Sequence, residues 1–114
     1  MRQELADEFS RTVPVAVKIA PDIDNVTIPS LAGLLVQHGI DAVIATNTTI
    51  DHSAIAGSQY ADEDGGMSGA PLKHRANEVV KLLYKELAGK VPVIGVGGIF
   101  SSEDAWQRLL AGAE

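Results

Sequence analysis

The segment Asp41-Ala-Val-Ile-Ala-Thr46 decides the fold class, because it is a short apolar run with a polar residue at each end. Apolar runs of this length are typical of parallel strands that are buried on both faces. Similar runs come before it, at Val13–Ala20, and after it, at Val91–Val96. Segments with helical spacing of apolar residues lie between the runs. This alternation predicts a parallel sheet whose strands are joined by helices.

Helix signals follow each predicted strand. A helix is expected from Thr27, whose hydroxyl can cap it, to about His38. A longer helix is expected at about Leu72–Leu87. A last helix should begin at Ser101, with Asp104 placed three residues later as in a capping box.

Composition argues against several kinds of site and partner. The chain has a net charge of -6 and no cysteine, so nucleic acid is a poor partner and disulfides and thiolate metal sites are excluded. The histidines lack the spacing of metal ligands, and no metal is expected. No apolar run reaches the roughly 18 residues that span a bilayer. Met1–Ser10 lacks the apolar core of a secretory signal.

Length indicates part of a larger unit. The 114 residues are fewer than half of the roughly 250 that a (β/α)8 barrel uses. Before the first strand lies a helical segment in which Leu5 and Phe9 are spaced to form one packing face. The last residues, Gly112–Glu114, come where another strand would begin. We therefore expect residues 1–114 to be a fragment of a single domain.

Polar residues stand at the ends of the first two predicted strands, where parallel α/β proteins bind ligands. Lys18 lies in an apolar run, and a buried ammonium requires an anionic partner. Lys18 could also reach solvent at the sheet edge or form an internal ion pair. Thr46-Asn-Thr-Thr49 offers hydroxyl and amide groups to a planar polar ligand, although the same residues are common in capped turns.

Glycine clusters follow the second and third strands. Gly65-Gly-Met-Ser-Gly69 ends a polar stretch that begins at Asn47 and is longer than ordinary connections, which predicts a functional loop; a flexible turn is the other interpretation. Gly95-Val-Gly-Gly-Ile99 lies between a strand and a helix. Exposed N–H groups and the helix dipole favour an anion there, in any of several phosphate-binding barrels.

In this order, four segments resemble the motifs of dihydroorotate dehydrogenases. They are Val15-Ala-Val-Lys-Ile-Ala-Pro-Asp22, Ile44-Ala-Thr-Asn-Thr-Thr49, Gly65-Gly-Met-Ser-Gly-Ala-Pro-Leu72 and Pro92-Val-Ile-Gly-Val-Gly-Gly-Ile99. The first two are similar to the quinone-linked (class 2) enzymes rather than to the soluble class. The resemblance covers about Val13–Glu114, the C-terminal half of the family's domain. It implies a partial (β/α)8 TIM barrel of about three parallel strands with flanking helices, within a single FMN-binding catalytic domain.

The resemblance also implies a reaction and its site residues. Dihydroorotate would lose a hydride to FMN and a proton to a base, and a membrane quinone would take the electrons, as a step of pyrimidine (UMP) synthesis. Residues expected to contact FMN are Lys18, Thr46, Gly69 and Gly98. Lys18 would stabilise the anionic reduced flavin, and Gly98 would lie near the phosphate. Residues expected to hydrogen-bond the substrate are Asn47 and Thr48.

Several parts of the family's machinery have no counterpart in this chain. The catalytic base, a serine, is expected upstream, so no catalytic residue is assigned here. A final strand with the rest of the phosphate site is expected after Glu114. The parent enzyme is expected to be peripheral to a membrane, the bacterial inner membrane, through a helical region that this chain lacks. The chain alone is therefore expected to be inactive.

Two other functions fit the residues without the resemblance. Another phosphate-binding TIM-barrel enzyme would use the Gly95–Ile99 loop and ignore orotate. A non-catalytic module that binds a nucleotide or a protein would need the 114 residues to fold as a stable unit. Open strand edges argue against that module, because they invite pairing with other chains.

Overall fold

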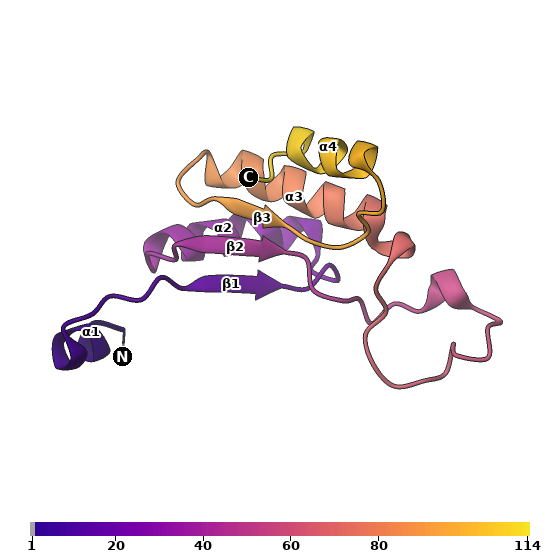
Figure 1. The fold of residues 1–114 in the computed structure, drawn as a ribbon, viewed down its shortest axis with the longest axis horizontal. Coiled ribbons are helices and arrows are strands. Elements are labelled where there is room, and N and C mark those ends of the chain that lie inside the picture. The colour runs from indigo at the N-terminus through magenta and orange to yellow at the C-terminus, as the bar shows by residue number, and fades with distance from the viewer. Residues whose placement is uncertain (1) are drawn as a thin grey trace.

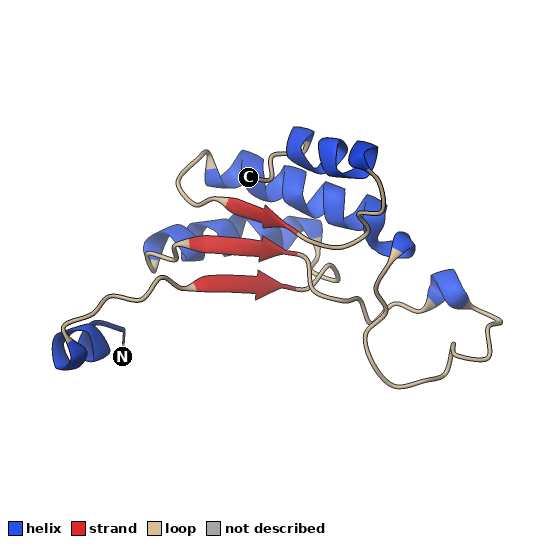
Figure 2. Cartoon of the chain, in the orientation of Figure 1, coloured by secondary structure: helices blue, strands red, loops and turns tan. Residues whose placement is uncertain are grey.

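Three short parallel strands form the centre of the structure, a computed structural model that describes residues 2–114. They pair in sequence order, so that each helix between neighbouring strands is a crossover (Figures 1 and 2). The strands are β1 (Ala16–Ile19), β2 (Ala42–Ala45) and β3 (Val93–Gly95). The predicted parallel sheet is confirmed, although each strand is shorter than the apolar run that predicted it.

The described residues form four α-helices, α1 (Arg2–Phe9), α2 (Ile28–Gln37), α3 (Lys73–Leu87) and α4 (Ser102–Leu110). The helices α2 and α3 cover one face of the sheet, and α4 packs on α3 (Figure 1). Helix α1 lies apart from the sheet at the N-terminal end (Figure 1). Within residues 2–114, no helix is both long enough and apolar enough to cross a membrane.

Alternate residues of each strand face opposite sides of the sheet. Val43 pairs in register with Val93, and both are buried in one apolar core with residues of α2 and α3. The largest fully buried side chains of the two helices include Ile28 and Leu83. This core, on one side of the sheet, fixes the strand register.

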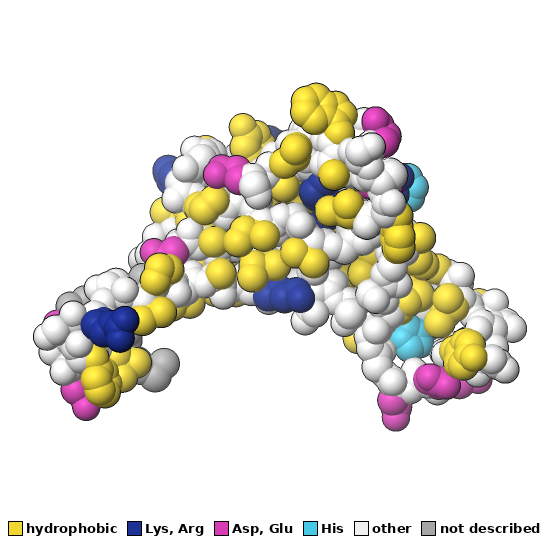
Figure 3. All heavy atoms as spheres, in the orientation of Figure 1, with side chains coloured by type: hydrophobic (Ala, Val, Ile, Leu, Met, Phe, Trp, Pro, Cys, Tyr) yellow, Lys and Arg dark blue, Asp and Glu magenta, His cyan; other side chains and the backbone are white. Residues whose placement is uncertain are grey.

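The other face of the sheet is uncovered by the part of the chain that the structure describes. Lys18, Ile44 and Ile94 share one row of the sheet on this face, and Ile94 is 40% exposed. Figure 3 shows hydrophobic side chains exposed over the strands. We call this surface the open face. The prediction that the strands are buried on both faces is therefore wrong for the described residues, because their helices pack on one side.

Two details of the helices differ from the prediction. Thr27 makes no side-chain cap; Asp24 instead accepts a hydrogen bond from the Val26 N–H and caps the short 3-10 turn that leads into α2. Leu5 and Phe9 are 49% and 62% exposed, so the predicted packing face of α1 is not buried by the described residues.

The predicted Ser101 cap of α4 is confirmed, because the Ser101 hydroxyl accepts a hydrogen bond from the Asp104 N–H at 3.1 Å.

The one-sided core makes a matched stability test possible. Leu83 of α3 is fully buried, whereas Leu34 of α2 is 51% exposed. We expect Leu83→Ala to lower the free energy of unfolding by about 2–5 kcal/mol, because it leaves a cavity. Leu34→Ala should change it by only about 0.5 kcal/mol. Urea denaturation followed by circular dichroism measures both, and equal effects would contradict the assigned core.

Candidate functional site

The carboxyl end of β2 is held on both sides by its neighbours. The Thr46 N–H donates to the Val96 carbonyl at 3.0 Å, and the Asn47 N–H donates to the Ile19 carbonyl at 2.7 Å. These bonds continue the strand pairing beyond β2 and fix the segment after it between the ends of β1 and β3. The predicted site residues that follow the three strands are thereby gathered along one edge of the sheet.

Thr46 and the glycine loop after β3 meet at this edge. Thr46 is only 2% exposed, and its hydroxyl has no hydrogen-bond partner among the described residues. A Cβ atom added to Gly97 would lie 3.9 Å from that hydroxyl, so the loop backbone borders it. Buried hydroxyl groups are normally hydrogen-bonded. A polar ligand group at this edge could supply the missing partner.

Lys18 lies on the open face rather than in the core. It is exposed, and within residues 2–114 no carboxylate forms an ion pair with its ammonium. Of the alternatives for this residue, the internal ion pair is therefore not found in the described chain. The side chain instead offers an uncompensated positive charge beside Ile44, its partner in the sheet.

The glycine loop approaches the start of α3 closely. Gly97 and Gly98 have φ angles of 98° and 69°, which favour glycine. A Cβ atom on Gly98 would lie 2.5 Å from the Cα atom of Lys73 and 2.6 Å from its backbone nitrogen. The described residues provide no acceptor for the N–H groups of Gly97 and Gly98. The N–H groups of the loop are therefore unpaired within the described chain, and Gly98 itself is buried against α3.

Gly69 lies close to the same junction. It has a φ of 94° and precedes the 3-10 turn Ala70–Leu72 that begins α3. A Cβ atom on Gly69 would lie 3.9 Å from the Phe100 ring, so the glycine cluster Gly65–Gly69 ends beside the segment that follows β3. The structure thus brings Thr46, Gly69 and Gly98 together along one edge.

Asn47 and Thr48, the predicted substrate ligands, are both exposed. The Thr48 hydroxyl lies against Gly66, where a Cβ atom would collide with it. The next residue, Thr49, is buried, and its hydroxyl donates to the Asp22 carboxylate. Thr49 also forms an antiparallel bridge with Met67, with N–H to carbonyl distances of 3.0 and 2.8 Å. This bridge closes the base of the long predicted loop.

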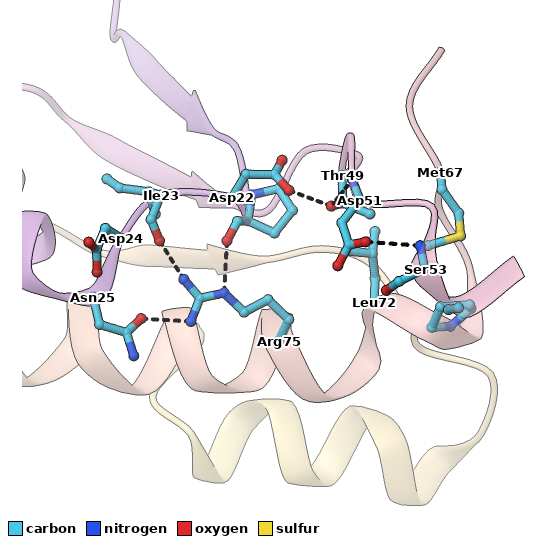
Figure 4. Close-up of a pocket in the computed structure, with 13 residues that line it drawn as sticks. Asp22, Ile23, Asp24, Asn25, Thr49, Asp51, Ser53, Met67, Leu72 and Arg75 are labelled. Carbon is cyan, nitrogen blue, oxygen red and sulfur yellow. Dashed lines mark hydrogen bonds between the residues drawn. The ribbon is translucent and has the colours of Figure 1, made fainter. Parts of the chain in front are cut away.

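A cleft of about 690 Å³ opens beside the strand ends, between the loop after β1 and the start of α3 (Figure 4). The Arg75 guanidinium crosses it and donates to the carbonyls of Pro21, at 2.8 Å, and Ile23. Asp22 and Thr49 line the cleft, but none of the six predicted site residues does. In the described range, no three His, Asp or Glu side chains gather as a metal site would require.

The starts of α3 and α4 are joined by a charged contact beneath the glycine loop. The Asp104 carboxylate forms an ion pair with Lys73 and accepts a hydrogen bond from the Phe100 N–H at 3.0 Å. The hydrogen bond from Lys73, and then that from Phe100, lower the pKa of Asp104 to about 2. This ion pair fixes the two helix N-termini relative to each other.

Replacement of Gly98 tests the close approach. Gly98→Ala should destabilise the protein by about 1–2 kcal/mol through its left-handed backbone and by a further 1–3 kcal/mol, roughly, through the collision with Lys73. Gly39→Ala is the matched control, because Gly39 has a φ of 59° and an added Cβ atom would meet nothing within 4 Å. Chemical denaturation measures both variants, and a cost at Gly98 no larger than at Gly39 would refute the close approach.

The ion pair predicts a pH dependence. Because the pKa of Asp104 falls from its ordinary 3.8 to about 2, its contribution to stability is present above the ordinary value and is lost as the pH falls towards 2. Wild-type protein should therefore exceed Asp104→Asn in unfolding free energy at roughly pH 5, and this difference should shrink on acidification. Asp62→Asn, in an exposed loop, controls for net charge. A difference that does not vary with pH would rule out the ionised pair as its source.

Comparison with known proteins identifies the family. The family model described as dihydroorotate dehydrogenase matches residues 1–114. The chain is 53% identical over 112 residues to the dihydroorotate dehydrogenase (quinone) of Thiobacillus denitrificans, covering 98% of this chain and 33% of that protein. It is 54% identical over 109 residues to the protein of the same name from Chromobacterium violaceum, covering 96% of this chain and 32% of that protein. The chain thus spans about a third of the length of these relatives.

Solved structures agree with the sequence relatives. The dihydroorotate dehydrogenase of Eimeria tenella in complex with ferulenol matches with a TM-score of 0.80 at 40% identity, covering 86% of this chain and 26% of that chain. Its ligand-free form matches with a TM-score of 0.79. The predicted part of a TIM barrel, three parallel strands with flanking helices, is confirmed by this likeness and by the sheet. The chain belongs to the dihydroorotate dehydrogenase family.

Proposed function

We propose that this chain is part of a quinone-dependent dihydroorotate dehydrogenase. In this proposal, the whole enzyme oxidises dihydroorotate to orotate with FMN in pyrimidine synthesis, and residues 1–114 are one segment of a single FMN-binding TIM-barrel domain. Support comes from the relatives that are more than half identical, which are named dihydroorotate dehydrogenase (quinone). Membership of this family leaves no reason to prefer another phosphate-binding barrel or a non-catalytic module.

One observation links the proposed function to particular residues of this chain. The buried hydroxyl of Thr46 has no hydrogen-bond partner within residues 2–114 and lies beside Gly97. It follows a sheet whose open face presents Lys18. A buried hydroxyl, loop N–H groups and an exposed ammonium thus lie towards the carboxyl ends of neighbouring strands. A ligand that carries both a polar ring and an anion could use all three.

The residues present fit FMN. The N–H groups of Gly97 and Gly98, which lack acceptors in the described chain, suit a phosphate. The Thr46 hydroxyl suits a polar atom of the flavin ring. Gly69 lets the backbone come close to the same edge. Bound FMN would supply the two-electron acceptor for the hydride that leaves dihydroorotate.

The chain's own side chains divide the remaining tasks. Lys18 would stabilise the negative charge of the reduced cofactor, because an ammonium already in place needs no reorganisation during the reaction. Asn47 would offer both a donor and acceptors to orotate, and Thr48 a hydroxyl. The proton released with the hydride would pass to a base in another segment of the enzyme. No residue of this chain is assigned that role.

The electron acceptor and the membrane belong to the whole enzyme. The word quinone in the relatives' names supports a quinone as the final acceptor. We propose that the enzyme is peripheral to the bacterial inner membrane and that segments other than residues 1–114 make the membrane contact. The chain alone should therefore show no dihydroorotate oxidation.

A chimera tests the function directly. Residues 1–114 would replace the matching third of the Thiobacillus denitrificans protein. The chimera should retain FMN and oxidise dihydroorotate with a quinone. Lys18→Met in it should slow reduction of the bound flavin by roughly 100-fold, because a preorganised charge is lost, without loss of FMN. Stopped-flow absorbance measures this rate.

Lys90→Met, at an exposed position after α3, is the matched control and should leave the rate unchanged. A folded chimera that retains FMN but does not oxidise dihydroorotate would count against the proposed reaction. Equal rates of flavin reduction in the Lys18 and Lys90 variants would show that Lys18 has no role at the flavin.

A further inference from the structure

Arg108 of α4 is a cation buried under the end of β3. Arg108 is only 2% exposed. Its stem crosses the backbone of Gly95, where an added Cβ atom would lie 2.5 Å from Cγ and 2.7 Å from Cδ of the arginine. A side chain at Gly95 would therefore displace Arg108. This explains why the strand ends in glycine at a point where φ does not require one.

The guanidinium of Arg108 reaches the glycine loop. Its Nε donates to the Asn77 side-chain oxygen at 2.5 Å, and one terminal nitrogen donates to the Gly97 carbonyl at 2.7 Å. The other terminal nitrogen has no partner among the described residues, and within that range no carboxylate forms an ion pair with Arg108. Arginine stays protonated in proteins, so a positive charge lies directly behind the loop.

The bond to Gly97 determines where the next N–H points. The Gly97–Gly98 peptide bond is trans, and in a planar trans peptide the carbonyl and the following N–H point in opposite directions. Because Arg108 holds the Gly97 carbonyl, the Gly98 N–H points away from the buried guanidinium. That N–H has no acceptor in the described chain.

We infer that Arg108 is a positioning residue for phosphate binding, which holds the Gly97 carbonyl so that the Gly98 N–H is presented to a phosphate monoester. The inference rests on the proposed flavin site, in which that monoester is the phosphate of FMN. The buried charge adds a favourable field behind the loop, fixed in place before the anion arrives. Arg108 itself needs no contact with the ligand.

Riboflavin separates this role from simple packing, because it has the flavin ring without the phosphate. The dissociation constants of FMN and riboflavin are measured by flavin fluorescence for the wild-type chain and for Arg108→Gln. Wild type should prefer FMN. Arg108→Gln removes the charged hydrogen-bond donor of the Gly97 carbonyl. It should therefore weaken FMN binding roughly tenfold or more and leave riboflavin binding nearly unchanged. Arg11→Gln, at an exposed position, should alter neither.

Asn77→Ala provides a second variant if Arg108→Gln fails to fold, as circular dichroism would show. It removes the acceptor for Nε and keeps the charge, so the preference for FMN over riboflavin should fall by a smaller factor. An unchanged preference, or equal losses for both ligands, would overturn the inference and leave Arg108 a packing residue. A wild-type chain that binds riboflavin as tightly as FMN would overturn the proposed phosphate site along with it. If the chain binds neither flavin, the same comparison of FMN with riboflavin is made on the flavin-free chimera, with and without Arg108→Gln, and an unchanged preference there would overturn the inference.

Discussion

Burial of one face of the sheet against α2 and α3 is the constraint on which the rest of the structure depends. Val43 and Val93 fix the register from that side, and alternate residues such as Lys18 must then face the other way. Parallel pairing places all the strand ends at one edge. The polar and glycine-rich segments that follow the strands therefore come together even though they are far apart in the sequence.

A second constraint acts at that edge. The glycine loop after β3 lies so close to Lys73 that Gly98 has no room for a side chain. The same loop is held by Arg108 from below, while the Lys73–Asp104 ion pair joins the starts of α3 and α4. Packing, backbone conformation and buried charge thus act on the same few residues. This restraint supports the proposal that the loop binds an anion.

The sequence was sufficient for the elements of the fold, because strand runs and helical spacing are local patterns. The rule that parallel strand ends share one edge depends only on topology, so the sequence also predicts that Thr46, Gly69 and Gly98 lie near one another, as they do in the structure. Their contacts with FMN stay predictions. The open face was not foreseen, because apolar strand runs do not reveal what covers each side. The exposure of Leu5 and Phe9 was not predicted for a similar reason, because helical spacing does not reveal whether another element covers the apolar face.

The sequence also did not predict the polar contacts between residues that are far apart along the chain. Arg108 and Asp104 are spaced like a surface pair on a helix, yet both are buried, and their partners Gly97 and Lys73 come from other elements. Arg75 and the cleft it crosses gave no signal either, because the guanidinium binds backbone carbonyls. One local clue existed at Gly95: a glycine inside a strand often marks close approach of another group.

The most direct test of the proposed flavin site is to map FMN on the isotope-labelled chain by amide chemical shifts in NMR. FMN should shift the amide signals of Thr46, Gly69, Gly97 and Gly98, which follow the strands at one edge. It should cause little change at Asp24, Ser53 and Arg75, which line the neighbouring cleft. Shifts concentrated in that cleft, with the glycine loop unmoved, would contradict the assignment of the flavin site.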